Sequence, residues 1–250
     1  MSVLIEREDH IGIITLDRAP ANAFDEAQTQ ALADAVTALG EDPAVRAVLI
    51  RSAQRIFCGG ADIAMMDSWS TAPDRGTRLR RFTAGLQDTF ARIEALPKPS
   101  VAALAGAATG GGLELALACD FRVAGASVTL GLPEVGIGLL PGAGGTQRLT
   151  RLAGPSVARR IILGAELVTG VEARRLGIVQ WASDGDVEAE ARALTRRLAQ
   201  LPPAAYAAAK RCIVAARGDR GFARELDEIG TLIETPETAG LLARFIARAR

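Results

Sequence analysis

The stretch SVAALAGAATGGGLELALACDFRVAG (residues 100–125) contains two apolar segments and a helical segment joined by a run of glycines. Residues 100–106 and 121–125 are short apolar runs, which are typical of buried strands. Between them, the triple glycine (110–112) leads into LELALAC (113–119), whose composition favours a helix. A strand, a turn, a helix and a second strand in this order predict an α/β fold.

The same alternation continues on both sides of this unit. Strands are expected at residues 3–7, 11–16 and 45–52 and near residues 178–179, and helices at residues 25–40 and 75–96. Asp25 is suited to cap the first of these helices, and Pro97 ends the second. From Val187 onward the pattern is all helical, interrupted by prolines. We therefore expect an α/β core over residues 1–186 and a helical region for oligomerisation over residues 187–250.

The composition argues against several classes of function. The 250 residues include 29 basic and 29 acidic side chains, a balance unlike that of a nucleic-acid binder with a broad basic face. No apolar run reaches the ~18 residues of a membrane span, and the first residues do not resemble a signal peptide. The three cysteines show no CxxC spacing, so we expect reduced thiols in a cytoplasmic protein.

The single histidine restricts the chemistry further. His10 lies beside an expected turn near the N-terminus, far in sequence from any candidate site. A Ser-His-Asp triad and a zinc site built from His and Cys are therefore disfavoured. If the chain is an enzyme, we expect carboxylates to serve as its acids and bases.

Two segments carry unusual glycines, FCGGAD (57–62) and ATGGGLE (108–114). Glycine allows a ligand to approach the backbone, and the second cluster directly precedes a helix, where free N–H groups favour an anion or a developing oxyanion. For either cluster alone, tight turns and close packing are the simpler interpretation. No GxxxxGK[ST] or GxGxxG pattern occurs, so neither a phosphate loop nor a dinucleotide fold is indicated.

Two glutamates stand out near these loops. Glu114 lies in the first turn of the helix after the triple glycine, where it could simply complement the helix dipole. Glu134 follows Pro133 in an apolar loop, and burial there would raise its pKa toward a range useful for proton transfer. The two form a candidate acid/base pair, although sequence position alone does not bring them together.

The complete set of motifs resembles the crotonase family, the enoyl-CoA hydratase/isomerase superfamily. The resemblance rests on FCGGADIAMM (57–66), AGAATGGGLELALACD (105–120) and LPEVGIGLLPGAGGTQRLTRLAG (132–154), and it covers nearly the whole chain. It implies a right-handed spiral of strand–strand–helix turns and a helical C-terminal region that packs trimers. We expect a trimer that is paired into a hexamer. Within the family, the chain looks most like the hydratases of fatty acid metabolism and β-oxidation.

The resemblance also implies roles for individual residues. The N–H groups of Ala61 and Gly111 would form an oxyanion hole for a thioester carbonyl. Glu114 would be the base toward water, and Glu134 would donate a proton to C2. No metal or redox cofactor would be needed, because coenzyme A is part of the substrate. Further substrate-binding positions would be Arg55, Gly59, Asp62, Ile63, Gly112, Pro133 and Gly142.

The chain departs from the family pattern in places. Ala64 stands where many relatives have a lysine, RAPANAFDEA (18–27) replaces a NAL-type sequence, and Arg248 falls where a neighbouring subunit often offers a lysine to coenzyme A. The alternative reactions are Δ3-Δ2-enoyl-CoA isomerisation and the (de)hydration of a specialised acyl-CoA. A non-catalytic acyl-CoA or RNA binder is disfavoured by both glutamates and by the balanced charge. We expect neither nucleic acid nor membrane as a partner.

Overall fold

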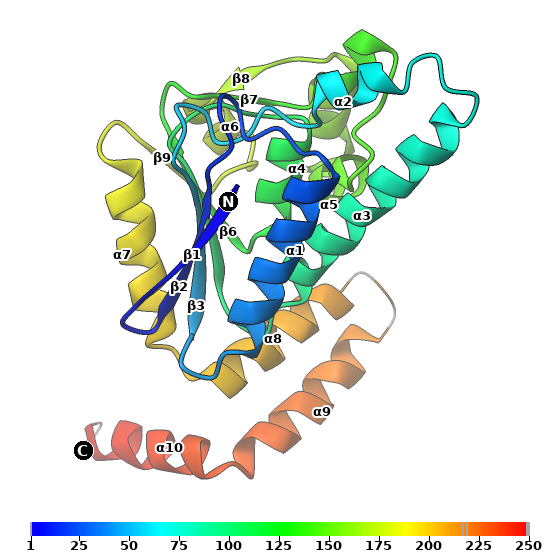
Figure 1. Ribbon diagram of the computed structural model, residues 1–250. Helices are drawn as coiled ribbons and strands as arrows, with labels where there is room; N and C mark the ends of the chain where they lie inside the picture. Colours follow the sequence, from blue (N-terminus) through cyan, green and yellow to red (C-terminus); the bar gives the residue numbers. More distant parts are fainter. Residues whose placement is uncertain (1, 217, 219, 249–250) are drawn as a thin grey trace.

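A six-stranded sheet runs through the centre of the computed structural model, which describes residues 2–216, 218 and 220–248 (Figure 1). The first two strands form an antiparallel hairpin, and every other pair in the sheet is parallel. In spatial order, the strands are β1 (Val3–Glu8), β2 (Ile11–Leu16), β3 (Ala47–Ser52), β4 (Ser100–Leu104), β6 (Phe121–Gly125) and β9 (Trp181–Ser183).

A smaller three-stranded sheet lies at the end of the molecule that carries the glycine-rich loops. Its strands are β5 (Ala108–Thr109), β7 (Thr129–Gly131) and β8 (Val168–Thr169). β5 pairs with β7 in parallel, and β7 pairs with β8 in antiparallel orientation. Because β5 immediately precedes the triple glycine, this sheet fixes where the following helix begins.

Helices cover both faces of the large sheet, as the alternation of its buried side chains requires. Val48 and Ile50 of β3 belong to the cluster packed by α1 (Glu26–Glu41), α3 (Arg75–Ala95) and α4 (Gly111–Ala118). Ala47 and Leu49 face the opposite cluster, which is packed by α7 (Val187–Ala199). Figure 1 shows α7 on one side of the sheet and α1 and α3 on the other.

The remaining helices are short or belong to the C-terminal region. They are α2 (Ile63–Ser68), the 3-10 helix η1 (Glu134–Ile137), α5 (Gly145–Ala158), the π-helix η2 (Arg159–Leu163), α6 (Gly170–Arg175), α8 (Pro203–Ala215), α9 (Gly221–Ile233) and α10 (Pro236–Arg248). No helix among the described residues is long and apolar enough to span a bilayer.

The α/β class and the helical C-terminal region are confirmed, and most elements begin where their sequence signals place them. Asp25 caps α1 by accepting a hydrogen bond from the Gln28 amide at 2.7 Å. The strand expected near residues 178–179 is present as β9, which begins slightly later, at Trp181. Ile178 and Val179 are buried through a turn in which both amides bond to the carbonyl of Ala173, so their apolar character reflects burial alone.

The region expected to serve oligomerisation has two parts. α7 packs on the sheet, whereas α9 and α10 contain no buried residue and extend away from the body (Figure 1). A cavity of about 730 Å³ separates the end of α3 from α8 and α9, and Leu96, Pro97 and Val214 are among its lining residues. We call α8, α9 and α10 the C-terminal arm.

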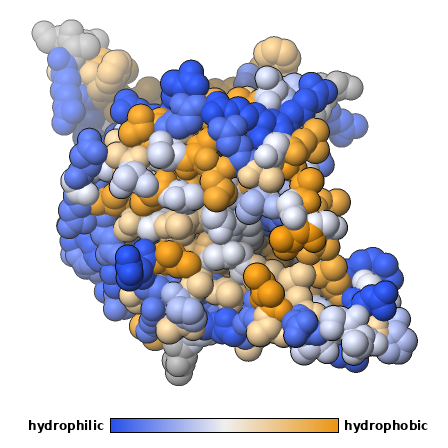
Figure 2. Space-filling view, turned by 90° about the horizontal axis from the view of Figure 1, so that it is seen from above, coloured by the Kyte–Doolittle hydropathy of each residue, from blue (hydrophilic) through white to orange (hydrophobic). Residues whose placement is uncertain are grey.

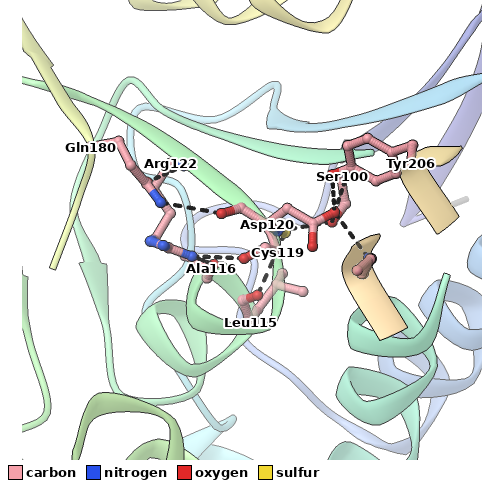
Figure 3. Close-up of polar contacts among 9 residues, drawn as sticks. Ser100, Leu115, Ala116, Cys119, Asp120, Arg122, Gln180 and Tyr206 are labelled. Atoms are coloured by element: carbon pink, nitrogen blue, oxygen red, sulfur yellow. Dashed lines mark hydrogen bonds and ion pairs between the residues drawn. The ribbon is translucent and has the colours of Figure 1, made fainter. Parts of the chain in front are cut away.

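A polar cluster around Asp120 attaches the arm to the core (Figure 3). One oxygen of Asp120 accepts four hydrogen bonds, from the amide (2.9 Å) and hydroxyl (3.0 Å) of Ser100, from the Tyr206 hydroxyl (3.0 Å) and from the Lys210 ammonium (2.9 Å). Ser100 opens β4 and both Tyr206 and Lys210 belong to α8, so this carboxylate joins the sheet to the first helix of the arm.

We expect Asp120→Asn to destabilise the attachment of α8. The Lys210 side chain is only 11% exposed and would lose its counter-charge, at a cost of about 3 kcal/mol in the free energy of unfolding. Urea denaturation measures this loss, and hydrogen exchange should locate it in α8. Asp184→Asn, at an exposed position, is the matched control. Equal protection of α8 in the variant and the parent would contradict this role of Asp120.

Candidate active site

The two glycine-rich segments lie against each other beside the small sheet. Cys58 forms a β-bridge with Ala108, and the Thr109 amide donates to the Cys58 carbonyl at 3.1 Å. A Cβ added at Gly112 would lie 2.2 Å from that carbonyl oxygen, so only glycine permits this approach. The loop of residues 57–62, which we call the oxyanion loop, is therefore packed directly on the start of α4.

This packing brings the amides of Ala61 and Gly111 close together. A Cβ built on Gly111 would lie 3.7 Å from the carbonyl carbon of Gly60, to which the nitrogen of Ala61 is bonded. Gly111 is the first residue of α4, so its N–H has no partner within the helix. Ala61 forms a parallel β-bridge with Phe24, in which the Gly60 carbonyl and the Asp62 amide make the hydrogen bonds to Phe24. The N–H of Ala61 therefore points away from Phe24.

Glu114 is buried one turn into α4, with 3% of its surface exposed. One carboxylate oxygen accepts a hydrogen bond from the Gly145 amide at 2.7 Å. The pKa of Glu114 is raised to about 7, mainly by burial and in part by the nearby charge of Glu134, whereas the amides of Gly145 and Ala143 oppose the shift. A carboxyl group with this pKa can gain or lose a proton near neutral pH.

Glu134 approaches the same place from η1. Its Oε2 atom is buried and has no hydrogen-bond partner among the described residues, and burial raises its pKa. A Cβ at Gly110 would lie 3.0 Å from its Oε1 atom, so this carboxylate lies over the turn that begins α4. The structure thus brings together the two glutamates that stood 20 residues apart in the sequence.

Two residues outside the expected site support Glu114 indirectly. Arg148 of α5 donates to the Ala143 carbonyl at 2.9 Å and pairs with Glu94 of α3 at 3.1 Å. Ala143 and Gly145 belong to the loop that bonds Glu114, so this ion pair holds that loop in place. Arg148 lies within the longest family motif, but 54 residues separate it from Glu94, and nothing in the sequence links the two.

The other expected substrate positions differ in their surroundings. Within or next to the oxyanion loop lie Gly59 and Ile63, whereas Pro133 and Gly142 lie on either side of Glu134 in sequence. Gln87 donates a hydrogen bond to the Gly142 carbonyl at 2.6 Å. Asp62 caps α2, and its side chain also pairs with an arginine. Arg55 is exposed just before the oxyanion loop.

The remaining basic candidates lie further away. The arginines at 75, 78, 80 and 81 are exposed on the first turns of α3. Arg248 ends α10, at the opposite end of the molecule from α2 (Figure 1). Arg248 is therefore remote from the glutamates of its own chain.

Exposed apolar side chains border the site. Ile63 (73% exposed), Ile137 (68%) and Leu140 (64%) follow closely after the oxyanion loop or after Glu134. Figure 2 looks down on the end of the molecule that carries α2 and shows apolar surface interspersed with hydrophilic residues. Such side chains are suited to contact an apolar ligand that passes between the two loops.

Comparison with known proteins gives a consistent result. The family model for enoyl-CoA hydratase/isomerase matches residues 6–239. A crotonyl-CoA hydratase of Syntrophomonas wolfei is 42% identical over 180 residues, which are 71% of this chain and 67% of that protein. A probable enoyl-CoA hydratase of Mycobacterium tuberculosis is 36% identical over 93% of this chain and 86% of its own length. The crystal structure of an enoyl-CoA hydratase from Bacillus anthracis has a TM-score of 0.92 at 30% identity, covering 99% of this chain and 97% of that one.

The raised pKa of Glu114 predicts a pH-dependent stability. The carboxyl ionises with a pKa of about 7 in the folded protein against an ordinary value of 4.5, so the folded state holds the proton more tightly. The contribution of Glu114 to the free energy of unfolding is fully present below its ordinary pKa. It is lost as the pH rises through about 7, and the total loss is roughly 3 kcal/mol. Glu114→Gln should remove this dependence. Urea denaturation between about pH 5 and pH 8 at one protein concentration tests it. Parallel pH profiles for the parent and the variant would contradict the burial of an ionisable Glu114.

Proposed function

The chain belongs to the enoyl-CoA hydratase/isomerase family, and on that premise we propose that it is an enoyl-CoA hydratase, which adds water reversibly across the C2=C3 double bond of a 2-enoyl-CoA thioester. The observation that carries this proposal is the pair formed by the buried Glu114 and the half-buried Glu134, both with raised pKa values, beside two neighbouring backbone amides. Hydration requires one group to accept a proton from water and another to donate a proton to C2.

The two amides account for the stabilisation of charge. When the oxygen of water attacks C3, the electrons of the double bond move toward the thioester, and negative charge develops on its carbonyl oxygen. The N–H groups of Ala61 and Gly111 donate to that oxygen. A single such donor typically contributes about 2.7–4 kcal/mol to the transition state.

The surroundings of the glutamates favour distinct roles. Hydrogen bonds from backbone amides favour the ionised form of Glu114, which suits a base that accepts the proton of water. We assign to Glu134 the proton that is given to C2, and its buried Oε2 atom, which has no hydrogen-bond partner among the described residues, can carry that proton. Each turnover leaves Glu114 protonated and Glu134 ionised, and proton exchange restores the starting state. The reaction needs no metal or redox cofactor.

We further propose that the chain forms a trimer, with two trimers paired as a hexamer. The support comes from the C-terminal arm, whose helices α9 and α10 expose large apolar side chains: Phe222 (85% exposed), Leu226 (73%), Ile229 (63%), Ile233 (56%), Phe245 (72%) and Ile246 (51%). An apolar stripe of this extent calls for a partner surface, and other copies of the chain supply one. A cytoplasmic location is also proposed, since Cys58, Cys119 and Cys212 are free thiols.

Replacing either glutamate should abolish most of the hydration activity. We expect Glu114→Gln and Glu134→Gln each to lower kcat for crotonyl-CoA by at least ~10²-fold, because each removes one proton transfer. KM should change little, so that kcat and kcat/KM fall together. Steady-state hydration followed by the loss of enoyl thioester absorbance measures both constants.

The matched control is Glu6→Gln on β1, an exposed position that changes the net charge equally. Normal hydration by Glu114→Gln together with an inactive Glu134→Gln would refute the water-holding role of Glu114. The isomerase reaction, which needs one carboxylate facing C2 and C4, would then replace hydration.

Assembly can be tested with the exposed stripe of α9. Analytical ultracentrifugation of the parent at micromolar concentration should show trimers or hexamers. The double variant Leu226→Glu, Ile229→Glu should dissociate, because two buried carboxylates without partners are costly at an interface. Glu225→Gln on the same helix is the control. A parent that sediments as a monomer would refute the proposal.

A further inference from the structure

The segment RAPANAFD (18–25), for which the reaction has so far no role, binds the oxyanion loop along its whole length. We call residues 18–25 the clamp. Three backbone hydrogen bonds join it to the loop: Gly59 N to Ala21 O (2.9 Å), Phe24 N to Gly60 O (2.7 Å) and Asp62 N to Phe24 O (2.8 Å). These bonds lie on both sides of Ala61, so the clamp determines the path of the backbone that carries its N–H.

Asn22 fixes the first half of the loop. Its side chain is fully buried and donates to the Phe57 carbonyl at 3.0 Å and to the Ser52 hydroxyl at 2.8 Å. Its side-chain oxygen accepts from the Arg18 amide at 2.7 Å, which closes the clamp on itself. The backbone of Asn22 is left-handed, with φ +50°, a conformation that asparagine tolerates better than most residues.

Arg18 fixes the second half of the loop. One guanidinium nitrogen lies 2.6 Å from Asp62 and 3.1 Å from Asp25, and the other donates to the Ala23 carbonyl at 2.9 Å. The side chain is only 30% exposed. Asp62 directly follows Ala61, so the ion pair acts one residue away from the proposed oxyanion donor.

The two carboxylate oxygens of Asp62 accept hydrogen bonds from different partners. Oδ1 accepts from the Met65 amide at 3.1 Å and caps α2, whereas Oδ2 accepts from Arg18. The cap therefore does not depend on Arg18. Removing the arginine leaves the cap of α2 in place and frees the Asp62 oxygen that ties the loop to the clamp, along with the contacts to Asp25 and the Ala23 carbonyl within the clamp.

We infer that Arg18 is a positioning residue that acts through Asp62 to aim the N–H of Ala61 at the thioester oxygen. This inference rests on the proposed function, because it needs Ala61 to be an oxyanion donor. A donor must lie at hydrogen-bond distance from the oxygen as negative charge develops on it. A small displacement of the loop therefore reduces the stabilisation of the transition state more than it reduces the affinity for substrate.

The test compares kinetics with the spectrum of a bound probe. Arg18→Met should lower kcat for crotonyl-CoA by between about 10- and 100-fold, since a displacement of about 1 Å at a reacting group has effects of this size. KM should change much less than kcat, the mark of an interaction made in the transition state. Bound 4-(dimethylamino)cinnamoyl-CoA, whose absorption moves to longer wavelength when its carbonyl is polarised, should show a smaller red shift than with the parent.

Four further variants separate positioning from general destabilisation. Arg18→Lys keeps one cation for Asp62 and should recover part of both kcat and the red shift. Asp62→Asn keeps the cap of α2 but loses the ion pair, so it should match Arg18→Met, and the double variant should be no worse than either single one. Arg51→Met removes another half-buried arginine, paired with Glu188 at 2.7 Å on the face covered by α7, and should leave the red shift unchanged.

The outcomes distinguish this inference from the proposed function. If the parent hydrates crotonyl-CoA and red-shifts the probe, and Gly111→Pro abolishes the shift by deleting one donor, the oxyanion hole is supported. In that case, an unchanged kcat and red shift in Arg18→Met and Asp62→Asn overturns the role of Arg18 alone. If the parent gives no red shift, or Gly111→Pro retains it, the oxyanion hole itself is wrong and the role of Arg18 falls with it.

Discussion

The close contact between the Cys58 carbonyl and Gly112 is the constraint on which the site depends. No side chain fits at residue 112, since a Cβ there would lie 2.2 Å from the carbonyl oxygen. The contact brings the oxyanion loop onto the first turn of α4 and makes neighbours of the amides of Ala61 and Gly111. Glu114 lies one turn further along the same helix, and its burial is the main cause of its raised pKa of about 7.

Around this contact, backbone hydrogen bonds and side-chain ion pairs together hold the elements of the site in place. The small sheet places β5, the clamp places the oxyanion loop, and the ion pair of Glu94 with Arg148 places the loop that bonds Glu114. The C-terminal arm is attached at a separate point, through Asp120 and Lys210 at the far end of the sheet. The proposed chemistry and the proposed assembly surface therefore rest on different parts of the sheet, joined by the strands between them.

The sequence predicts features whose cause is local and misses those whose cause is distant. The cap at Asp25, the glycine-rich turns and the prolines that interrupt the C-terminal helices all act within a few residues, and the structure has these elements where they were expected.

Other features have no local signal in the sequence. β7 and β8, with three and two residues, are too short to show a periodic pattern of apolar residues. Partial burial of Glu134 was expected from its apolar neighbours, whereas its approach to Gly110 follows only from the fold. The contact of Arg18 with Asp62 spans 44 residues and has no sequence signal. The catalytic roles of the glutamates stay predictions.

The division between backbone donors and carboxylate side chains has an evolutionary consequence. An amide N–H is encoded by no particular codon, so among single substitutions only proline removes it from Ala61 or Gly111. Glu114 and Glu134, in contrast, can each be exchanged by one mutation. A gene with this architecture can therefore drift at the two positions that are proposed to transfer protons while it keeps the amides that are proposed to stabilise an enolate. On this proposal, new reactions of acyl thioesters are accessible from this scaffold by changes at residues 114 and 134, without rebuilding the loops that would bind the thioester oxygen.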